Sequence, residues 1–310
     1  MSIQKLFSHG TRARSAVVVI ICACLSSLAL SVVVLAADPP KSDPSEKAKS
    51  PPQTAVKEAS PVTSVVSTDS AASELPKPPI DEAHPLYLPL QEAYKAREAL
   101  KALKEYEADF VKRELLGRRL QATTMKLKLR EEPFSVYLKF MDASAGREVI
   151  YFHGRNNNQL LIHEAGLKSL AGTVFRAPNA ADVMAENRYP VTMIGLKSML
   201  EKVIKQWEDE GKFGEVKTQK YPSAKLPSGE VCIAYESLHP TPRNQFKFHI
   251  TRLWIETQTG LAIRVEQLGF PQKNDKAPPV IEEYTYANLK ANAKLTDIDF
   301  DRTNRAYAFP

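Results

Sequence analysis

Strict alternation between apolar and polar side chains is the feature that most constrains how this chain can fold. In residues 123–131, Met125, Leu127 and Leu129 are separated by single basic residues. Successive side chains of a β-strand point to opposite faces, so this pattern predicts a strand with one buried and one solvated face. Similar patterns predict further strands in residues 134–140, 147–152, 159–164, 215–221, 230–238, 245–256, 261–270 and 281–289.

The segments between these strands indicate how the strands are connected. Asp142 to Gly146 supply turn-forming residues, and the triple asparagine at 156–158 tolerates the left-handed backbone of a hairpin turn. After Thr251 the apolar phase of residues 245–256 shifts, which predicts a bulge or bend. Neighbouring strands with short connections predict an antiparallel meander.

Two segments instead show the three- and four-residue spacing of amphipathic helices. The first begins near Leu86 and extends to about Glu105. In the second, Thr192 is the expected N-cap, a stripe from Leu196 to Trp207 is buried, and Gly211 ends the helix. Helix, strands, helix and then more strands is an α+β order.

This order, together with particular segments, resembles the fold of the bacterial lipoprotein carriers LolA and LolB. The resemblance is carried by residues 108–117 (ADFVKRELLG), 131–140 (EEPFSVYLKF), 146–163 and 284–300, with Asn292 and Phe300 at the expected end. It implies a single curved antiparallel β-sheet, an open half-barrel, with helices covering its concave face. Residues 106–309 are also similar to an exported domain of unknown function found mainly in planctomycetes.

The N-terminal part of the chain has a different composition. Basic residues precede an uncharged apolar stretch from Ser15 to Ala37, which predicts that residues 1–37 are a signal peptide or an N-terminal membrane anchor. Residues 38–80 are rich in Pro and Ser and predict a disordered tether. We therefore expect a LolA-like α+β domain at residues 81–310. The protein would be exported, either periplasmic or membrane-anchored and facing the periplasm.

The sequence contains no recognisable catalytic or metal-binding pattern. Ser169 lacks the glycine spacing of a hydrolase nucleophile, and Cys232 lies in an alternating strand where a small apolar residue would serve equally. His153 and His163 are not expected to meet across their hairpin. Asp297 to Asp301 resemble the start of a calcium loop but lack its glycine and final acid. We expect no enzymatic activity, cofactor or metal.

Two parts of the chain could bind an anionic ligand, but for each of them a purely structural role is the better interpretation. The basic row Lys126, Lys128 and Arg130 could face anionic lipid but is more simply a solvated face. The helix start from Thr192 to Gly195 could bind an anion, although capping explains it equally. The net charge of +6 includes no basic stripe of the kind that binds nucleic acid.

The remaining hypothesis is geometric. A curved sheet carries more aromatic and aliphatic surface than two helices need cover, which predicts a cell-envelope protein that binds an acyl chain, lipid or lipoprotein between sheet and helices. Its partner would be a lipid or lipidated protein, with membrane contact through the N-terminal segment if it is uncleaved. The alternative is an envelope protein-interaction module with a filled core. The expected ligand-lining residues are Phe134, Val136, Leu138, Phe140, Tyr151, Phe246, Phe248 and Trp254.

Overall fold

The computed structural model describes residues 77–142 and 144–310. The segments predicted to be an export signal or anchor (1–37) and a tether (38–80) lie outside the described residues, apart from positions 77–80. The helices are α1 (Tyr87–Leu100), α2 (Ala181–Met184) and α3 (Leu196–Glu210), with 3-10 segments η1 (Asn156–Asn158), η2 (Gly166–Ala171), η3 (Val191–Met193) and η4 (Asp297–Phe300).

All described strands belong to one antiparallel sheet. They are β1 (Glu105–Leu116), β2 (Arg119–Arg130), β3 (Ser135–Phe140), β4 (Glu148–Phe152), β5 (Leu160–His163), β6 (Thr173–Arg176), β7 (Lys217–Lys225), β8 (Val231–Leu238), β9 (Ile250–Glu256), β10 (Ala262–Leu268) and β11 (Val280–Ala291). Their order is β6-β5-β4-β3-β2-β1-β11-β10-β9-β8-β7, so the sheet is open and β6 and β7 are its edges.

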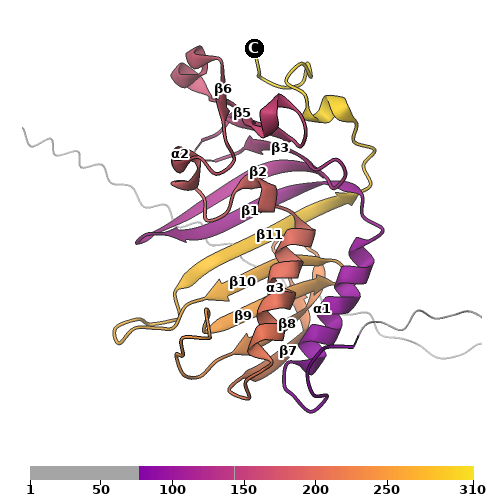
Figure 1. Cartoon of the computed structure of the whole chain (residues 1–310), viewed down its shortest axis with the longest axis vertical. Coiled ribbons are helices and arrows are strands. Elements are labelled where there is room, and N and C mark those ends of the chain that lie inside the picture. The colour runs from indigo at the N-terminus through magenta and orange to yellow at the C-terminus, as the bar shows by residue number, and fades with distance from the viewer. Residues whose placement is uncertain (1–76, 143) are drawn as a thin grey trace, which may run out of the picture. The chain divides into compact units, whose positions relative to one another are not determined.

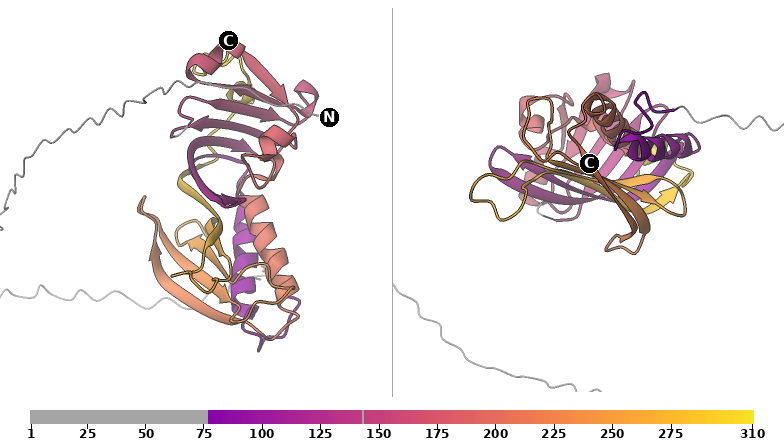
Figure 2. Two further views of the ribbon diagram at one scale, coloured as in Figure 1. Left: turned by 90° about the vertical axis from the view of Figure 1, so that its left-hand side faces the viewer. Right: turned by 90° about the horizontal axis from the view of Figure 1, so that it is seen from below.

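The sheet consists of two meanders joined by the first and last strands. Strands β1 to β6 pair in chain order, as do β7 to β11, and β1 pairs with β11 from Tyr106 opposite Ala291 to Glu114 opposite Glu282. We call this β1–β11 pairing the seam. Figures 1 and 2 show that the sheet curves and that α1 and α3 lie together on one of its faces. The predicted fold class is confirmed.

The main core lies between the sheet and these helices. Helix α3 buries Leu200, Val203 and Trp207, and α1 buries Leu90 and Ala93. The indole nitrogen of Trp207 donates to the Ser237 hydroxyl at 2.9 Å, so the buried polar group is satisfied.

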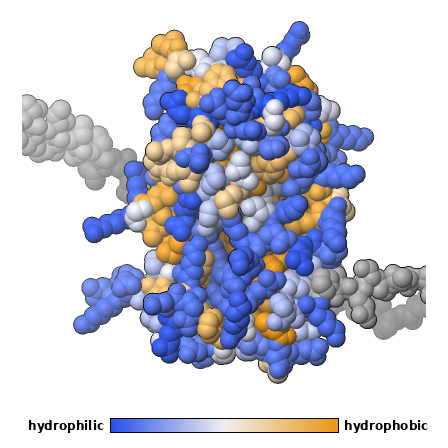
Figure 3. All heavy atoms as spheres, viewed as in Figure 1, coloured by the Kyte–Doolittle hydropathy of each residue, from blue (hydrophilic) through white to orange (hydrophobic). Residues whose placement is uncertain are grey.

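Much of the surface seen from the helix side is hydrophilic, with a group of apolar residues at the end where η2 and β6 lie (Figure 3). There Leu167 and Leu170 are almost fully exposed.

The start of α3 differs from the prediction. Thr192 is exposed and caps nothing, and the helix begins after Gly195. The Gly195 amide donates to the Tyr286 hydroxyl at 2.9 Å, and the Leu196 amide donates to the Tyr106 hydroxyl at 3.0 Å. Two buried tyrosines of the seam therefore replace the predicted cap. They also occupy amides that the anion-binding alternative required to be free.

Three other features differ from the prediction: the end of α1, the start of β9 and the presence of β6. Helix α1 ends at Leu100, because β1 already begins at Glu105 and places Tyr106 beneath α3. The segment 246–249 lies outside β9, which pairs with β8 without interruption from Ile250 to Glu256. The pairing of β9 with β10 does shift register after Thr251, where Trp254 faces Arg264 and Ile255 faces Ala262, but the extra residue is in β10 and not in β9. Strand β6 carries no clear alternation and was not predicted.

The opposite face of the sheet carries a smaller core under the C-terminal segment. Phe300 and Phe309 are buried against Tyr137, Ile150 and Phe152 of β3 and β4. The ring of Tyr307 stacks on that of Tyr137, with centroids 3.9 Å apart. This covering was not predicted. It explains why Tyr137, Ile150 and Phe152 are buried although they alternate with the residues of the main core.

Candidate ligand-binding cavity

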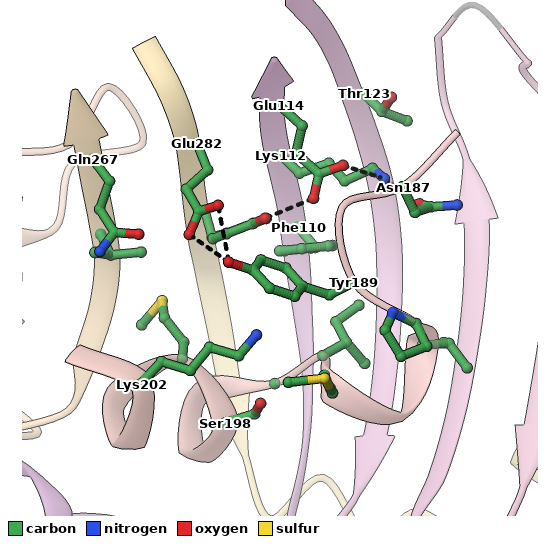
Figure 4. Close-up of a pocket in the computed structure, with 18 of the residues that line it drawn as sticks. Phe110, Lys112, Glu114, Thr123, Asn187, Tyr189, Ser198, Lys202, Gln267 and Glu282 are labelled. Carbon is green, nitrogen blue, oxygen red and sulfur yellow. Dashed lines mark hydrogen bonds and ion pairs between the residues drawn. The ribbon is translucent and has the colours of Figure 1, made fainter. Parts of the chain in front are cut away.

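A cavity of about 1140 Å³ lies between the sheet and the segment that leads into α3. Its floor is the helix-facing side of β1 to β5, β10 and β11, and its roof comes from residues 183–210 (Figure 4). Cavities that hold small molecules usually have volumes of about 300 to 1,000 Å³, so the space suffices for a ligand of considerable size.

The floor is apolar where β3 to β5 and the Met125 side chain of β2 form it. Alternate residues of these strands contribute Met125, Leu138, Val149, Leu160 and Ile162, all of them buried. Because only every second side chain of a strand faces the cavity, the apolar surface is continuous across neighbouring strands. The roof above it adds Val183, Pro190, Val191, Met193 and Ile194.

Three of the eight residues predicted to line a ligand site lie in the cavity wall: Leu138, Phe140 and Phe248. Val136, Tyr151 and Phe134 face the same main core, but beyond the cavity. The other two residues lie elsewhere.

Phe246 and Trp254 were grouped with the site as aromatic residues of the curved sheet, and neither of them lines the cavity. Phe246 precedes β9 and stacks on the His239 ring, with centroids 3.8 Å apart. Trp254 neighbours a separate small depression with Tyr221 and Arg252, and the Arg264 guanidinium lies 4.9 Å from its ring centre.

Near the seam, the cavity wall is polar and its charges are paired. Glu114 is buried; it accepts a hydrogen bond from the Tyr284 hydroxyl at 2.6 Å and lies 3.2 Å from the Lys112 ammonium. Glu282 is also buried and accepts from Arg188 at 2.7 Å. Buried carboxylates are costly unless they are paired, and both are paired here.

The roof segment is fastened to the sheet through these carboxylates. The Arg188 guanidinium also donates to the Leu115 carbonyl at 3.0 Å, and the Tyr189 hydroxyl donates to Glu282 at 3.0 Å (Figure 4). Lys112 donates to the Asn187 side chain. Burial opposes the charge of Arg188, but Glu282 raises its pKa. Burial, followed by the neighbouring Glu282, raises the pKa of Tyr189, so the phenol stays protonated.

Lys202 points from α3 into the cavity beside Tyr189 (Figure 4). Its ammonium lies 3.4 Å from the Tyr189 ring centre. Within residues 77–310 it forms no ion pair and no hydrogen bond with a side chain. Burial lowers the pKa of Lys202, with Glu282 acting in the opposite direction.

These polar residues were missed in the sequence, although a signal existed. Glu282 shares a strand face with Tyr284 and Tyr286, and Lys112 and Glu114 follow Phe110 on one face of β1. Charged residues in the apolar phase of an alternating strand indicate either an internal ion-pair network or a site. The sequence alone does not show which strands lie side by side at those positions.

The other predicted candidates lie away from the cavity. His153 is exposed in the β4–β5 connection, whereas His163 pairs with Glu148 in register and packs its ring near Phe309. Burial raises the pKa of the Cys232 thiol to about 12, which disfavours a reactive thiolate at neutral pH. The residues described contain no cluster of ligands suited to a metal ion.

The basic row of β2 and the aspartates of η4 pair with each other. Lys128 lies 2.6 Å from Asp299, and Arg130 lies 2.8 Å from Asp297. Asp299 also forms a capping box with Thr296. The row is therefore partly covered by the C-terminal segment, which corrects its interpretation as a solvated face.

No helix in residues 77–310 has the length and apolar character needed to cross a bilayer.

Comparison with protein families gives one match. Residues 103–309 match the model of DUF1571, described as a protein of unknown function. This confirms the predicted similarity to a family without an assigned activity. None of the curated proteins matches the chain.

Similar solved structures include three bacterial proteins. A LolA superfamily protein from Nitrosomonas europaea has a TM-score of 0.28 at 9% identity, over 68% of this chain and 96% of that one. LprF from Mycobacterium bovis has a TM-score of 0.37 at 14% identity, over 67% and 94%. MucB in the Pseudomonas aeruginosa MucA/MucB complex has a TM-score of 0.39 at 15% identity, over 68% and 60%.

Proposed function

The chain belongs to the DUF1571 family of proteins of unknown function, and we propose that it is a non-enzymatic envelope protein that binds an apolar or amphiphilic ligand between its sheet and its helical cover. The observation that carries the proposal is the cavity of about 1140 Å³ with a continuous apolar floor. Burial of an acyl chain on that floor would contribute about 0.8 kcal/mol for each CH₂ group removed from water. Export, as expected from residues 1–37, would bring the protein to lipids and lipidated proteins.

The cavity favours this proposal over an interaction module with a filled interior. In such a module, no space of about 1140 Å³ would remain beside the rows of Met125, Leu138, Val149 and Ile162. Protein interiors are packed nearly as densely as organic crystals and contain few voids larger than a water molecule. A space of this size beside apolar side chains is therefore better explained by a ligand.

The test is uptake of the neutral dye N-phenyl-1-naphthylamine, whose fluorescence rises in apolar surroundings, followed by displacement with lipid. We expect the full chain to take up the dye with micromolar affinity and to release it when lipid is added. The Thr123→Trp variant should lose at least tenfold in affinity, because Thr123 lines the cavity and an indole there would cover part of the floor on which the dye binds.

The matched control is Thr124→Trp. Thr124 is the next residue of β2, so its side chain points to the opposite face of the sheet, and it does not line the cavity. This variant should bind the dye like the natural chain. Equal dye binding by both variants, or no uptake by the natural chain, would overturn the proposal.

A further inference from the structure

We propose that the ligand carries an anionic head group, and that the Lys202 ammonium is the residue that receives it. This inference rests on the proposed function and adds the ligand's chemical class. The observation behind it is that Lys202 points into the cavity without an ionic partner among residues 77–310.

The other charged groups of the cavity wall show why Lys202 differs from them. Lys112 is paired with Glu114, Arg147 with Glu186 at 2.7 Å, and Lys205 with Asp209 at 3.0 Å. Two further basic wall residues, Arg119 and Lys247, are exposed to solvent at the rim. Lys202 alone among the basic residues of the wall is half-buried and unpaired.

The nearby acids do not compete for this position. Glu282 is engaged by Arg188 and Tyr189, and Glu114 by Lys112 and Tyr284. Both therefore have partners that neutralise or satisfy them. The wall includes acids and bases in similar numbers, and it is their pairing that leaves Lys202 without a counterion.

The contact with Tyr189 accounts for the position of Lys202 in the absence of ligand. An ammonium over an aromatic face is attracted by the negative potential of the ring. That contact uses one side of the ammonium, whose three N–H donors can still reach an oxygen of a ligand. A carboxylate or phosphate seated there would place its attached acyl chain at the entrance to the apolar floor.

The head-group chemistry is tested by displacement of N-phenyl-1-naphthylamine with lipids that share one oleoyl chain. Oleate and lysophosphatidylglycerol carry an anionic head, methyl oleate is neutral, and lysophosphatidylcholine is zwitterionic. We expect the two anions to bind about tenfold more tightly than methyl oleate, a preference of about 1.4 kcal/mol. The ranking of oleate against lysophosphatidylglycerol distinguishes a carboxylate from a phosphodiester.

The substitution Lys202→Met retains the length of the side chain and removes its charge. It should abolish the preference for anions while leaving the affinity for methyl oleate unchanged. Lys202→Arg should retain the preference. The control Lys197→Met, which removes an exposed lysine of α3 outside the cavity wall, should also retain it.

The possible outcomes separate this inference from the proposed function. If methyl oleate and oleate bind equally, or if Lys202→Met keeps the preference, the head-group assignment is wrong and ligand binding stands. If no lipid displaces the dye, or if the dye does not bind, both proposals are wrong.

Discussion

At the scale of single residues, Gly195 fixes where α3 begins and how closely it approaches the sheet. Its backbone has φ +112° and ψ 161°, a region essentially restricted to glycine. A Cβ at this position would lie 2.9 Å from a methyl carbon of Leu129 and 3.2 Å from the Tyr106 hydroxyl. The residue therefore combines a backbone requirement with a steric one.

We predict that Gly195→Ala lowers the free energy of unfolding by about 2 kcal/mol or more, the usual cost of such backbone strain. Chemical denaturation followed by the fluorescence of the two tryptophans, Trp207 and Trp254, measures the change. The control is Gly214→Ala, where an added Cβ meets nothing within 4 Å and φ is not positive. Equal stability of the two variants would show that the α3 start tolerates a side chain.

Residues also mark the limit of what the sequence predicted. Alternation identified the strands because each apolar row has to reach a core, and the positive φ values of Asn156, Asn157 and Asn158 confirm the predicted turn. The cap of α3 could not be predicted, because the hydroxyls that accept hydrogen bonds from its first amides belong to distant residues. Tyr106 is 90 residues from Leu196, and Tyr286 is 91 residues from Gly195. Local sequence contains no information about such a distant partner.

At the scale of elements, the C-terminal segment acts as a second cover for the sheet. Its aromatic residues pack on β3 and β4, and its aspartates pair with β2. The Arg130 hydrogen bond lowers the pKa of Asp297. Because Asp297 has its lower pKa in the folded state, its stabilising contribution is present above the unfolded pKa of about 3.9 and is lost as the pH falls through the folded value.

We predict that Phe309→Ala lowers the free energy of unfolding by about 3 kcal/mol, as is usual for removing a buried phenylalanine ring. It should also increase hydrogen exchange in residues 295–310 before the rest of the sheet is affected. Arg305→Ala, at an exposed position of the same segment, is the control. An unchanged stability for Phe309→Ala would mean that this cover contributes little.

Comparison of the elements also shows which part of the site could be predicted. The apolar floor followed from strand alternation, and Leu138, Phe140 and Phe248 lie in the cavity wall, whereas their contact with a ligand stays a prediction. The part of the roof that precedes α3, residues 183–195, could not be predicted, because it contains little regular structure. Its position depends on Arg188 and Tyr189 reaching β11, a contact across more than 90 residues.

At the scale of the whole domain, the seam makes one sheet out of two meanders. Phe110 of β1 stacks on Tyr286 of β11 with ring centroids 4.7 Å apart, and on Tyr284 at 6.3 Å. Both strands also supply residues of the cavity wall. The two meanders should consequently unfold together, and the cavity should be lost with the seam.

We predict that Phe110→Ala lowers the free energy of unfolding by about 3 kcal/mol and abolishes dye binding at lower denaturant concentration than in the natural chain. Hydrogen exchange should show β4 and β8, one from each meander, losing protection at the same concentration. Val111→Ala, on the opposite face of β1, should have a smaller effect. Separate transitions for β4 and β8 would contradict the cooperative role of the seam.

The position of β11 has a consequence for synthesis. Residues 280–291 follow all the other described strands in the chain, yet they pair with the first of them. Until then, the full length of β1 presents an unpaired edge, which is a template for aggregation. A nascent chain of this protein is therefore open to strand addition along β1 until β11 has been synthesised and has paired.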